Sequence, residues 1–251
     1  MVDQLWRGDG RGAGDPDAFL GPYDRLPASR GAARGRVACG TLLRTAWQVR
    51  VHGSEHVPVD GPVIVAGNHT GFLDGPLLYG TCPRPVHALT KEEMFVGPLR
   101  PLLLSVGQIP ICRTAVDRAA LRDCLGVLAD GRLLGVYPEG TRGEGDFSAI
   151  KGGLAWLALR TGAPVVPLAS FGVRQPERGV STALPPLRSR IDAVYGPAFH
   201  VEASEPWGPY LPRRVVARAS ERVQHRLLAH LAYACELTSN PVPASARPYT
   251  S

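Results

Sequence analysis

The sequence predicts a single α/β domain with a mostly parallel central sheet flanked by helices. Short apolar runs of four or five residues alternate with longer amphipathic segments along the middle of the chain, which is the pattern of strand–helix–strand units. Within each run the apolar residues are consecutive, as in strands that are buried on both faces. The 251 residues are 44% hydrophobic, and a chain of this size can bury one sizeable core.

The strands and helices can be assigned in order along the chain. The apolar runs are expected to form strands at residues 62–66, 86–89, 108–111, 133–137 and 164–168. The amphipathic segments are expected to form helices at residues 36–50, 71–79, 115–129, 152–160 and 211–237, with Thr114 as the N-cap of the third. Residues 1–34 and 239–251 are rich in Gly, Pro and polar residues, and we expect a disordered leader and tail around a domain at 35–238.

Composition restricts the compartment and the partners. The five cysteines are scattered without a Cys-x-x-Cys pair, as is usual for reduced thiols in the cytoplasm. The chain shows no export signal and no apolar stretch of the roughly 18 residues that a membrane span needs. The formal charge of +6 favours anionic partners such as a phospholipid surface. We expect a cytoplasmic protein, peripheral on the inner face of the cell membrane. Nucleic acid is not an expected partner, because no nucleic-acid-binding motif is present.

The most informative motif is Asn68-His69-Thr70-Gly71-Phe72-Leu73-Asp74. A histidine with a nearby carboxylate can remove a proton from a hydroxyl group. Positions five residues apart on one helix point away from each other, so His69 and Asp74 can meet only if His69 lies on the turn before a helix that carries Asp74. Gly71 would permit that bend. The motif therefore predicts a catalytic pair, His69 and Asp74.

A second motif, Tyr137-Pro138-Glu139-Gly140-Thr141-Arg142, follows a predicted strand. Gly140 and Thr141 can offer backbone and hydroxyl donors to a phosphate, and Arg142 can bind its oxygens in a bidentate manner. Glu139 is expected to orient an arginine or the acceptor. Both motifs come just after apolar runs, so we expect them at the carboxyl edge of the sheet, where open α/β sheets bind ligands.

These blocks resemble those of the glycerolipid acyltransferase family, whose best known members are the 1-acylglycerol-3-phosphate acyltransferases. The resemblance covers about residues 50 to 200. Four blocks match in order: Asn-His-x-x-x-x-Asp at Asn68, His69 and Asp74; Gly-x-Ile-x-Ile-x-Arg at Gly107, Ile109, Ile111 and Arg113; Phe-Pro-Glu-Gly-Thr-Arg-Ser at 137–143; and Val-Pro at Val166 and Pro167. Tyr137 replaces the family's Phe, Gly143 replaces its Ser, and Pro110 and Cys112 depart from the second block.

The resemblance implies a glycerol-3-phosphate acyltransferase-like fold and an O-acyltransferase activity. Such an enzyme moves a fatty acyl group from acyl-CoA or acyl carrier protein to the free hydroxyl of a lysophosphatidate-like acceptor, giving phosphatidate in phospholipid biosynthesis. It needs neither a metal nor a cofactor beyond the acyl donor. The resemblance also implies substrate-binding roles for Asn68, Lys91, Arg113, Glu139, Gly140, Thr141 and Arg142.

Several residues have a second interpretation. Lys91 matches a family lysine, but it could equally be a surface lysine paired with Glu92 or Glu93. Cys112 is the only rival nucleophile, and its apolar neighbours favour a structural thiol. The apolar stretches 37–47 and 99–106 could contact a membrane or pack on the core. Arginines recur at every fourth position of the last predicted helix, where a lipid-facing stripe and a solvated face are both possible; they are Arg214, Arg218, Arg222 and Arg226.

Other functions are also compatible with parts of the sequence. The acceptor could be another lysophospholipid or a polyol lipid. A catalytically weak lipid-binding protein of the membrane surface would explain the basic charge and the altered second block. A metal-dependent hydrolase would need further ligands around His69, and no recognisable spacing supplies them.

Overall fold

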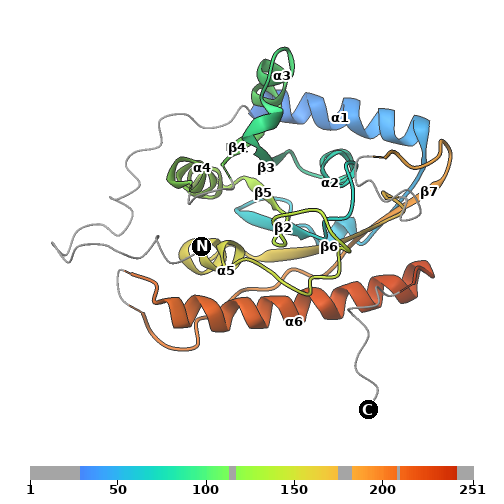
Figure 1. The fold of residues 1–251 in the computed structure, drawn as a ribbon. Helices are drawn as coiled ribbons and strands as arrows, with labels where there is room; N and C mark the ends of the chain where they lie inside the picture. The colour runs from blue at the N-terminus through green and yellow to red at the C-terminus, as the bar shows by residue number, and fades with distance from the viewer. Residues whose placement is uncertain (1–28, 113–116, 175–182, 208–209, 242–251) are drawn as a thin grey trace.

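The computed structural model describes residues 29–112, 117–174, 183–207 and 210–241, which form helices and strands in alternation (Figure 1). In chain order they are α1 Ser29–Ala46, β1 Gln48–His52, η1 Ser54–His56, β2 Val63–Gly67, α2 Asp74–Thr81, β3 Val86–Lys91, η2 Glu92–Met94, α3 Leu99–Ser105, β4 Ile109–Ile111, α4 Arg118–Ala129, β5 Leu133–Val136, α5 Gly153–Thr161, β6 Val165–Phe171, β7 Arg190–Tyr195 and α6 Arg213–Thr238.

The seven strands form one sheet in the order β1-β7-β6-β2-β5-β3-β4. Strands β6, β2, β5, β3 and β4 are mutually parallel, and they are the five strands predicted from the sequence. β7 pairs antiparallel with β6, and β1 pairs parallel with β7, so these two strands run in the opposite direction at one edge. The predicted α/β domain with a mostly parallel sheet is confirmed, with two strands that the sequence analysis did not predict.

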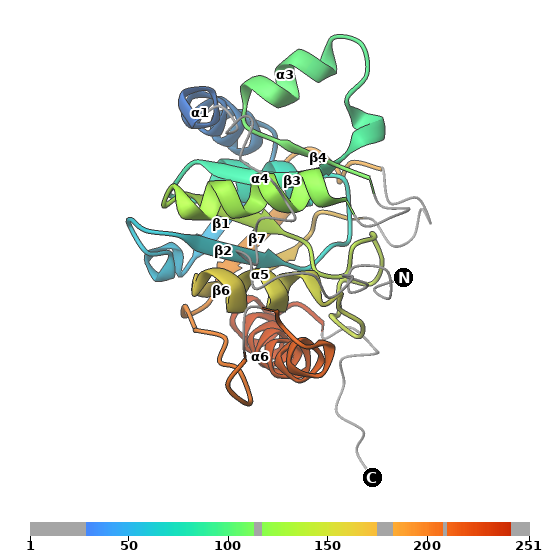
Figure 2. The same cartoon turned by 90° about the vertical axis from the view of Figure 1, so that its left-hand side faces the viewer.

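Helices cover both faces of the sheet (Figures 1 and 2). Side chains of a strand point alternately to its two faces, and β2 shows the consequence. Val63 and Val65 lie in the core cluster that includes residues of α1 and α2, whereas Ile64 and Ala66 lie in the cluster that includes residues of α4, α5 and α6. β2 is therefore buried on both sides, which explains its uninterrupted apolar sequence.

Three predicted helix boundaries need correction. The helix expected at 36–50 ends at Ala46, because residues Gln48–His52 form strand β1, which pairs with β7. The helix expected from residue 115 begins at Arg118, where Asp117 caps it by accepting from the Ala120 N–H at 3.0 Å; the expected cap, Thr114, lies outside the described residues. The helix expected from residue 71 begins at Asp74.

The ends of the predicted domain are only partly described. Residues 29–34, which the sequence analysis places in the leader, form the first turns of α1. Residues 1–28 and 242–251 lie outside the described residues. None of the five cysteines forms a disulfide.

The two apolar stretches proposed for membrane contact lie on α1 and α3, which are neighbours on one side of the domain (Figure 1). In α1, Leu43 packs in the core, whereas Leu42 is 67% exposed. α3 buries none of its residues, although it carries four leucines. Across the part of the chain that the structure describes, no helix combines the length and apolar character needed to span a bilayer.

Three of the four arginines that recur every four residues on α6 contact a neighbouring loop. Arg214 Nε forms an ion pair with Glu205 Oε1 at 2.6 Å. Arg222 donates to the Glu202 carbonyl, and the Arg226 guanidinium lies 5.9 Å from the centre of the Phe199 ring. These contacts favour a structural role for the three side chains over a lipid-facing stripe.

Candidate active site

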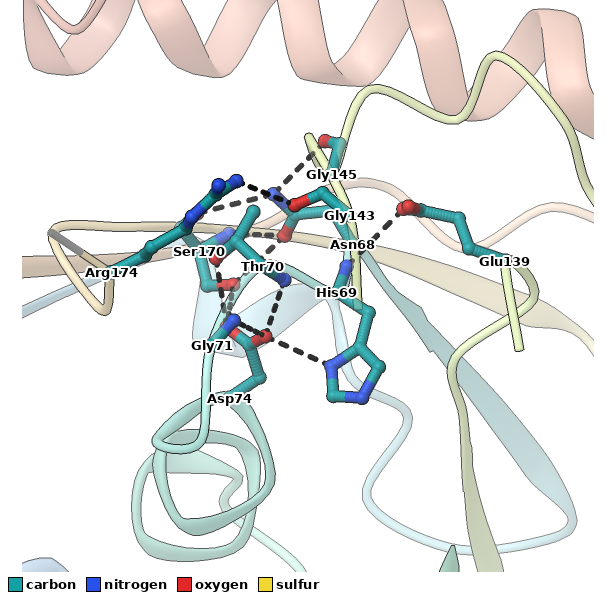
Figure 3. Close-up of polar contacts among 10 residues, drawn as sticks. All are labelled: Asn68, His69, Thr70, Gly71, Asp74, Glu139, Gly143, Gly145, Ser170 and Arg174. Atoms are coloured by element: carbon teal, nitrogen blue, oxygen red, sulfur yellow. Dashed lines mark hydrogen bonds and ion pairs between the residues drawn. The ribbon is translucent and has the colours of Figure 1, made fainter. Parts of the chain in front are cut away.

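His69 and Asp74 form a close pair at the carboxyl end of β2 (Figure 3). His69 lies two residues beyond the strand, and Asp74 is the first residue of α2. His69 Nδ1 is 2.9 Å from Asp74 Oδ2. The same oxygen accepts from the backbone N–H groups of Thr70 at 2.6 Å and Gly71 at 2.8 Å. The turn before the helix therefore brings the two side chains together, as the spacing predicted, and leaves His69 Nε2 as the nitrogen that can face a substrate.

Gly71 is required for a reason that differs from the expected one. Its φ angle is not in the left-handed region, so the bend does not depend on glycine's conformational freedom. A Cβ at this position would lie 2.6 Å from the carbonyl oxygen of Val173. The segment after β6 is packed directly against the turn, and only a residue without a side chain leaves room for it.

Asn68 holds the end of β2 to the end of β6. Its Nδ2 donates to the carbonyls of Gly145 at 3.3 Å and Ser170 at 3.2 Å, and its Oδ1 accepts from the Ser170 N–H at 2.8 Å. Asn68 is only 2% exposed. Because its amide is buried and bonded to protein groups, these contacts favour a role for Asn68 in positioning the loops around His69 over the expected contact with substrate.

Tyr137 forms the wall on one side of the His69 imidazole. The rings of His69 and Tyr137 stack with centroids 4.5 Å apart and an interplanar angle of 25°. The same ring covers Gly67, where a Cβ would lie 2.9 Å from Tyr137 Cε1. Burial and the neighbouring charge of Asp74 raise the pKa of Tyr137 well above its usual value, so its hydroxyl stays protonated. Strands β2 and β5 thus restrict the plane of the imidazole.

Glu139 supports the backbone of His69. Its Oε1 accepts from the His69 N–H at 3.2 Å, while the His69 carbonyl accepts from the Gly143 N–H at 2.9 Å. Burial, reinforced by the nearby Asp146 and Asp74, raises the pKa of Glu139 to about 7. The Glu139 carboxyl group thus holds the histidine backbone, and its expected role in orienting an arginine or the acceptor stays a prediction.

Gly140 turns the chain after Glu139 with φ +73°. A Cβ on Gly140 would lie 2.6 Å from both Cε and Nζ of Lys151, so the lysine side chain crosses the turn at this point. Thr141 is exposed at the tip of the turn. The Gly140 N–H donates to the Tyr137 carbonyl at 3.0 Å. The donors that the turn presents to an anion are therefore the Thr141 hydroxyl and the Lys151 ammonium group.

Arg142 lies beside the residues that follow His69. Its guanidinium carbon is 5.7 Å from the centre of the Phe72 ring. Its Nε is buried and has no hydrogen-bond partner among the described residues. A guanidinium stacked on an aromatic ring and left with unused donors can take a bidentate anion such as phosphate. The structure thus brings Arg142 next to the His69 turn, as the sequence analysis expected.

The remaining expected residues lie farther along the sheet or outside its described part. Lys91 is exposed at the carboxyl end of β3, two strands from β2. Cys112 follows β4, three strands from β2, which corresponds to about 14 Å at the usual strand spacing. This position does not support Cys112 as a nucleophile beside His69. Arg113 lies outside the described residues. Among the residues that are described, no group of three or more His, Cys, Asp or Glu side chains is placed to hold a metal ion.

Sequence comparisons relate the chain to acyltransferases. Residues 48–170 match the profile of the family described as Acyltransferase. The chain is 32% identical over 135 residues to a 1-acyl-sn-glycerol-3-phosphate acyltransferase of Borreliella burgdorferi, which covers 52% of this chain and 54% of the relative. It is 29% identical over 137 residues to the protein of the same name in Bacillus subtilis, covering 54% of this chain and 68% of the relative.

A solved structure shows the same fold. The 1-acyl-sn-glycerophosphate (LPA) acyltransferase PlsC of Thermotoga maritima superposes with a TM-score of 0.56 and 24% identity, over 81% of this chain and 78% of that one. Residues 48–170 form a domain of the acyltransferase family. The chain spans about half the length of the Borreliella relative that it matches.

Proposed function

We propose that the protein transfers a fatty acyl group from an acyl thioester to the free hydroxyl of a lysophosphatidate-like acceptor. The observation that carries this proposal is the His69–Asp74 pair at 2.9 Å, placed beside an arginine that makes no hydrogen bond within the described residues. The names of the Borreliella and Bacillus relatives support the same reaction.

The proposed chemistry follows from the positions of the two imidazole nitrogens. Asp74 accepts from Nδ1–H, which leaves Nε2 as the base. Nε2 takes the proton of the acceptor hydroxyl as its oxygen attacks the thioester carbonyl carbon. The tetrahedral intermediate then expels the thiolate with cleavage of the carbon–sulfur bond, and the thiolate takes the proton from the imidazolium. The thioester supplies its own leaving group, so no acyl-enzyme is required.

Arg142 is the proposed anchor for the acceptor phosphate. Its guanidinium has unused donors and a position fixed by Phe72, and Lys151 and Thr141 add donors on the neighbouring turn. Binding the phosphate there would align the hydroxyl with His69, which can remove several kcal/mol from the barrier. Roles for Lys91 and Arg113 in the same headgroup site remain part of the proposal.

We also propose that α1 and α3 bring the enzyme to an anionic membrane surface, where its lipid acceptor is found. The two helices expose Val37, Leu42, Leu99, Leu102 and Leu104. They also carry five arginines, Arg30, Arg34, Arg36, Arg44 and Arg100, and no acidic residue. Apolar side chains flanked by cationic ones favour the interface of an anionic bilayer. Replacing Leu99 and Leu102 by Ser should weaken binding to vesicles that contain phosphatidylglycerol, whereas Leu184→Ser, an exposed control outside these helices, should not.

The decisive experiment follows thiol release from purified protein. The protein is incubated with acyl-CoA or with acyl carrier protein loaded with the same chain, together with a panel of acceptors: lysophosphatidate, other lysophospholipids and a polyol lipid. We expect the fastest turnover with lysophosphatidate. A preference for another acceptor would keep the chemistry and change the substrate. Vesicle binding without thiol release from any pair would overturn the acyltransferase function and favour a lipid-binding protein.

A further inference from the structure

Ser170 lies outside every motif that the sequence analysis singled out, yet its hydroxyl reaches the catalytic pair (Figure 3). We infer that Ser170 is a positioning residue, whose hydroxyl holds the Asp74 carboxylate in the orientation that the imidazole of His69 requires. This inference rests on the proposed function for the role of His69 as a base. The contacts themselves are independent of the substrate.

The three side chains involved are buried together. Ser170 is 4% exposed, Asn68 2% and Asp74 1%. Ser170 Oγ is 2.8 Å from Asn68 Oδ1 and 3.0 Å from Asp74 Oδ1. Both neighbours are acceptors, but a hydroxyl group has a single proton to donate. Ser170 must therefore favour one of them.

The surroundings of the two acceptors favour Asp74. Asn68 Oδ1 already accepts from the backbone N–H of Ser170, and the amide cannot turn over because its Nδ2 donates to two carbonyls. Asp74 Oδ1 has only one other donor, the Thr70 hydroxyl, at the limiting distance of 3.5 Å. Hydrogen bonds to a carboxylate are stronger than those to a neutral amide oxygen. The Ser170 proton is thus directed to Asp74, while Asn68 holds the serine backbone.

The result is a carboxylate held through both of its oxygens. Oδ2 takes the three donors of the His69 turn, and Oδ1 takes the hydroxyl from β6. A carboxylate gripped only at Oδ2 could rotate about its Cβ–Cγ bond and tilt the acceptor away from Nδ1. Ser170 belongs to the strand that pairs with β2, so the register of the sheet sets the plane of the catalytic acid.

Loss of this donor should change the pH dependence of the reaction in a defined direction. Without the hydroxyl, more negative charge remains on Asp74 opposite the imidazole, which favours the protonated ring. Because the base must be neutral, the acidic limb of the kcat/KM profile should move to higher pH. The other titratable groups around the pair, Glu139, Asp146 and Tyr137, are unchanged by the substitution.

The test compares Ser170→Ala and Ser170→Thr with Ser220→Ala as a matched control. Ser220 donates to the Val216 carbonyl within α6 and touches neither His69 nor Asp74. With lysophosphatidate as acceptor, Ser170→Ala should lower kcat by about 10- to 100-fold, leave KM within about two-fold, and shift the acidic limb upward. Ser170→Thr keeps the hydroxyl and should recover most of kcat. The Ser220→Ala control should match the wild-type protein.

A second measurement does not depend on turnover. The His69 Nδ1–H proton, observed by NMR in the substrate-free protein, should move downfield in Ser170→Ala because its acceptor becomes stronger. An unmoved resonance together with an unchanged acidic limb would overturn the inference, whatever the effect on stability. If the wild-type protein releases no thiol with any acceptor, the proposed function fails, while the NMR comparison still decides the role of Ser170.

Discussion

The described part of the chain contains two close histidine–aspartate pairs, His69–Asp74 and His52–Asp192, and only the first has the geometry of a general base. His69 Nδ1 is 2.9 Å from Asp74, whereas His52 Nε2 is 3.6 Å from Asp192. The second distance is too long for a hydrogen bond, and His52 Nε2 and Asp192 Oδ1 have no hydrogen-bond partner.

The difference comes from the backbone around each carboxylate. Asp74 is the first residue of a helix that follows a turn. Two backbone N–H groups of that turn, from Thr70 and Gly71, donate to its carboxylate and hold it next to the imidazole. Asp192 lies within β7, where the backbone N–H groups serve the sheet, and its Oδ2 is bound by Arg190 Nε at 2.7 Å. A nearby acid alone does not make a catalytic histidine. The turn that orients the acid and leaves Nε2 accessible is also required.

Removing each histidine should give the largest contrast between the pairs. His69→Ala is expected to lower turnover by roughly 100- to 10,000-fold, because the general base is lost. His52→Ala should leave turnover close to that of the wild-type protein. Thiol release measured at saturating donor and acceptor checks both, and equal losses in the two variants would contradict the distinction drawn here.

Changing the acids tests the orientation of the ring. Asp74→Asn keeps the shape of the side chain but can present a donor to Nδ1, which favours the wrong tautomer, so kcat should fall by about 100- to 10,000-fold. The paired substitution Asp192→Asn should reduce the unfolding temperature through its lost ion pair with Arg190 while kcat is maintained. A normal kcat for Asp74→Asn would show that the carboxylate does not orient the base.

Arg142 supplies a contrast in substrate binding. Arg142→Ala should raise KM for lysophosphatidate by about 10- to 100-fold, because a charge-assisted bidentate contact is lost, and should change KM for an uncharged polyol lipid little. Arg190→Ala, at the second pair, serves as the control and should leave both KM values unchanged. A uniform rise in KM for charged and uncharged acceptors would argue against a phosphate contact.

The smallest expected effect concerns Glu139 and stability. Its pKa is raised from 4.5 to about 7 by burial, so the folded protein favours the protonated acid, and this carboxyl group makes the fold less stable as the pH rises from about 4.5 to about 7. Glu139→Gln removes the titration and keeps an oxygen acceptor for the His69 N–H. Thermal unfolding should show similar midpoints for both proteins at low pH and a higher midpoint for Glu139→Gln above pH 7. A gap that does not vary with pH would contradict the raised pKa.

The pattern of apolar residues was sufficient to predict the parallel part of the sheet. β2 and β5 are buried on both faces, so their sequences are apolar without interruption. β1 and β7 were missed because each mixes charged and apolar residues, as in Gln48–His52 and Arg190–Tyr195. β1 is the edge strand of the sheet, where polar side chains can reach solvent, and in β7 the charges of Arg190 and Asp192 pair with each other. Neither arrangement can be recognised from the local sequence pattern.

The candidate site was predicted where its chemistry depends on local spacing. The interval from His69 to Asp74 follows from one turn, and the Glu139–Arg142 turn is also contiguous. Ser170 was missed, although it stands three residues after the Val166-Pro167 block at the end of a strand beside β2. The sequence analysis predicted that Asn68 and Glu139 bind substrate. In the structure both side chains form hydrogen bonds with backbone groups of other loops and strands, and the sequence does not show which backbone groups lie near them.

The sequence by itself determined the order of the five parallel strands along the chain, the pairing of a histidine with an acid five residues later, and the chemistry that such a pair can perform. These features arise from residues close together in the chain. Only the tertiary structure decided which oxygen of Asp74 faces the imidazole, what holds the other oxygen, and which of the two histidine–aspartate pairs is competent. Those outcomes depend on β5 and β6, which lie beside β2 although their residues are about 70 and 100 residues away along the chain, respectively. A hydrogen bond forms only where packing brings donor and acceptor into line.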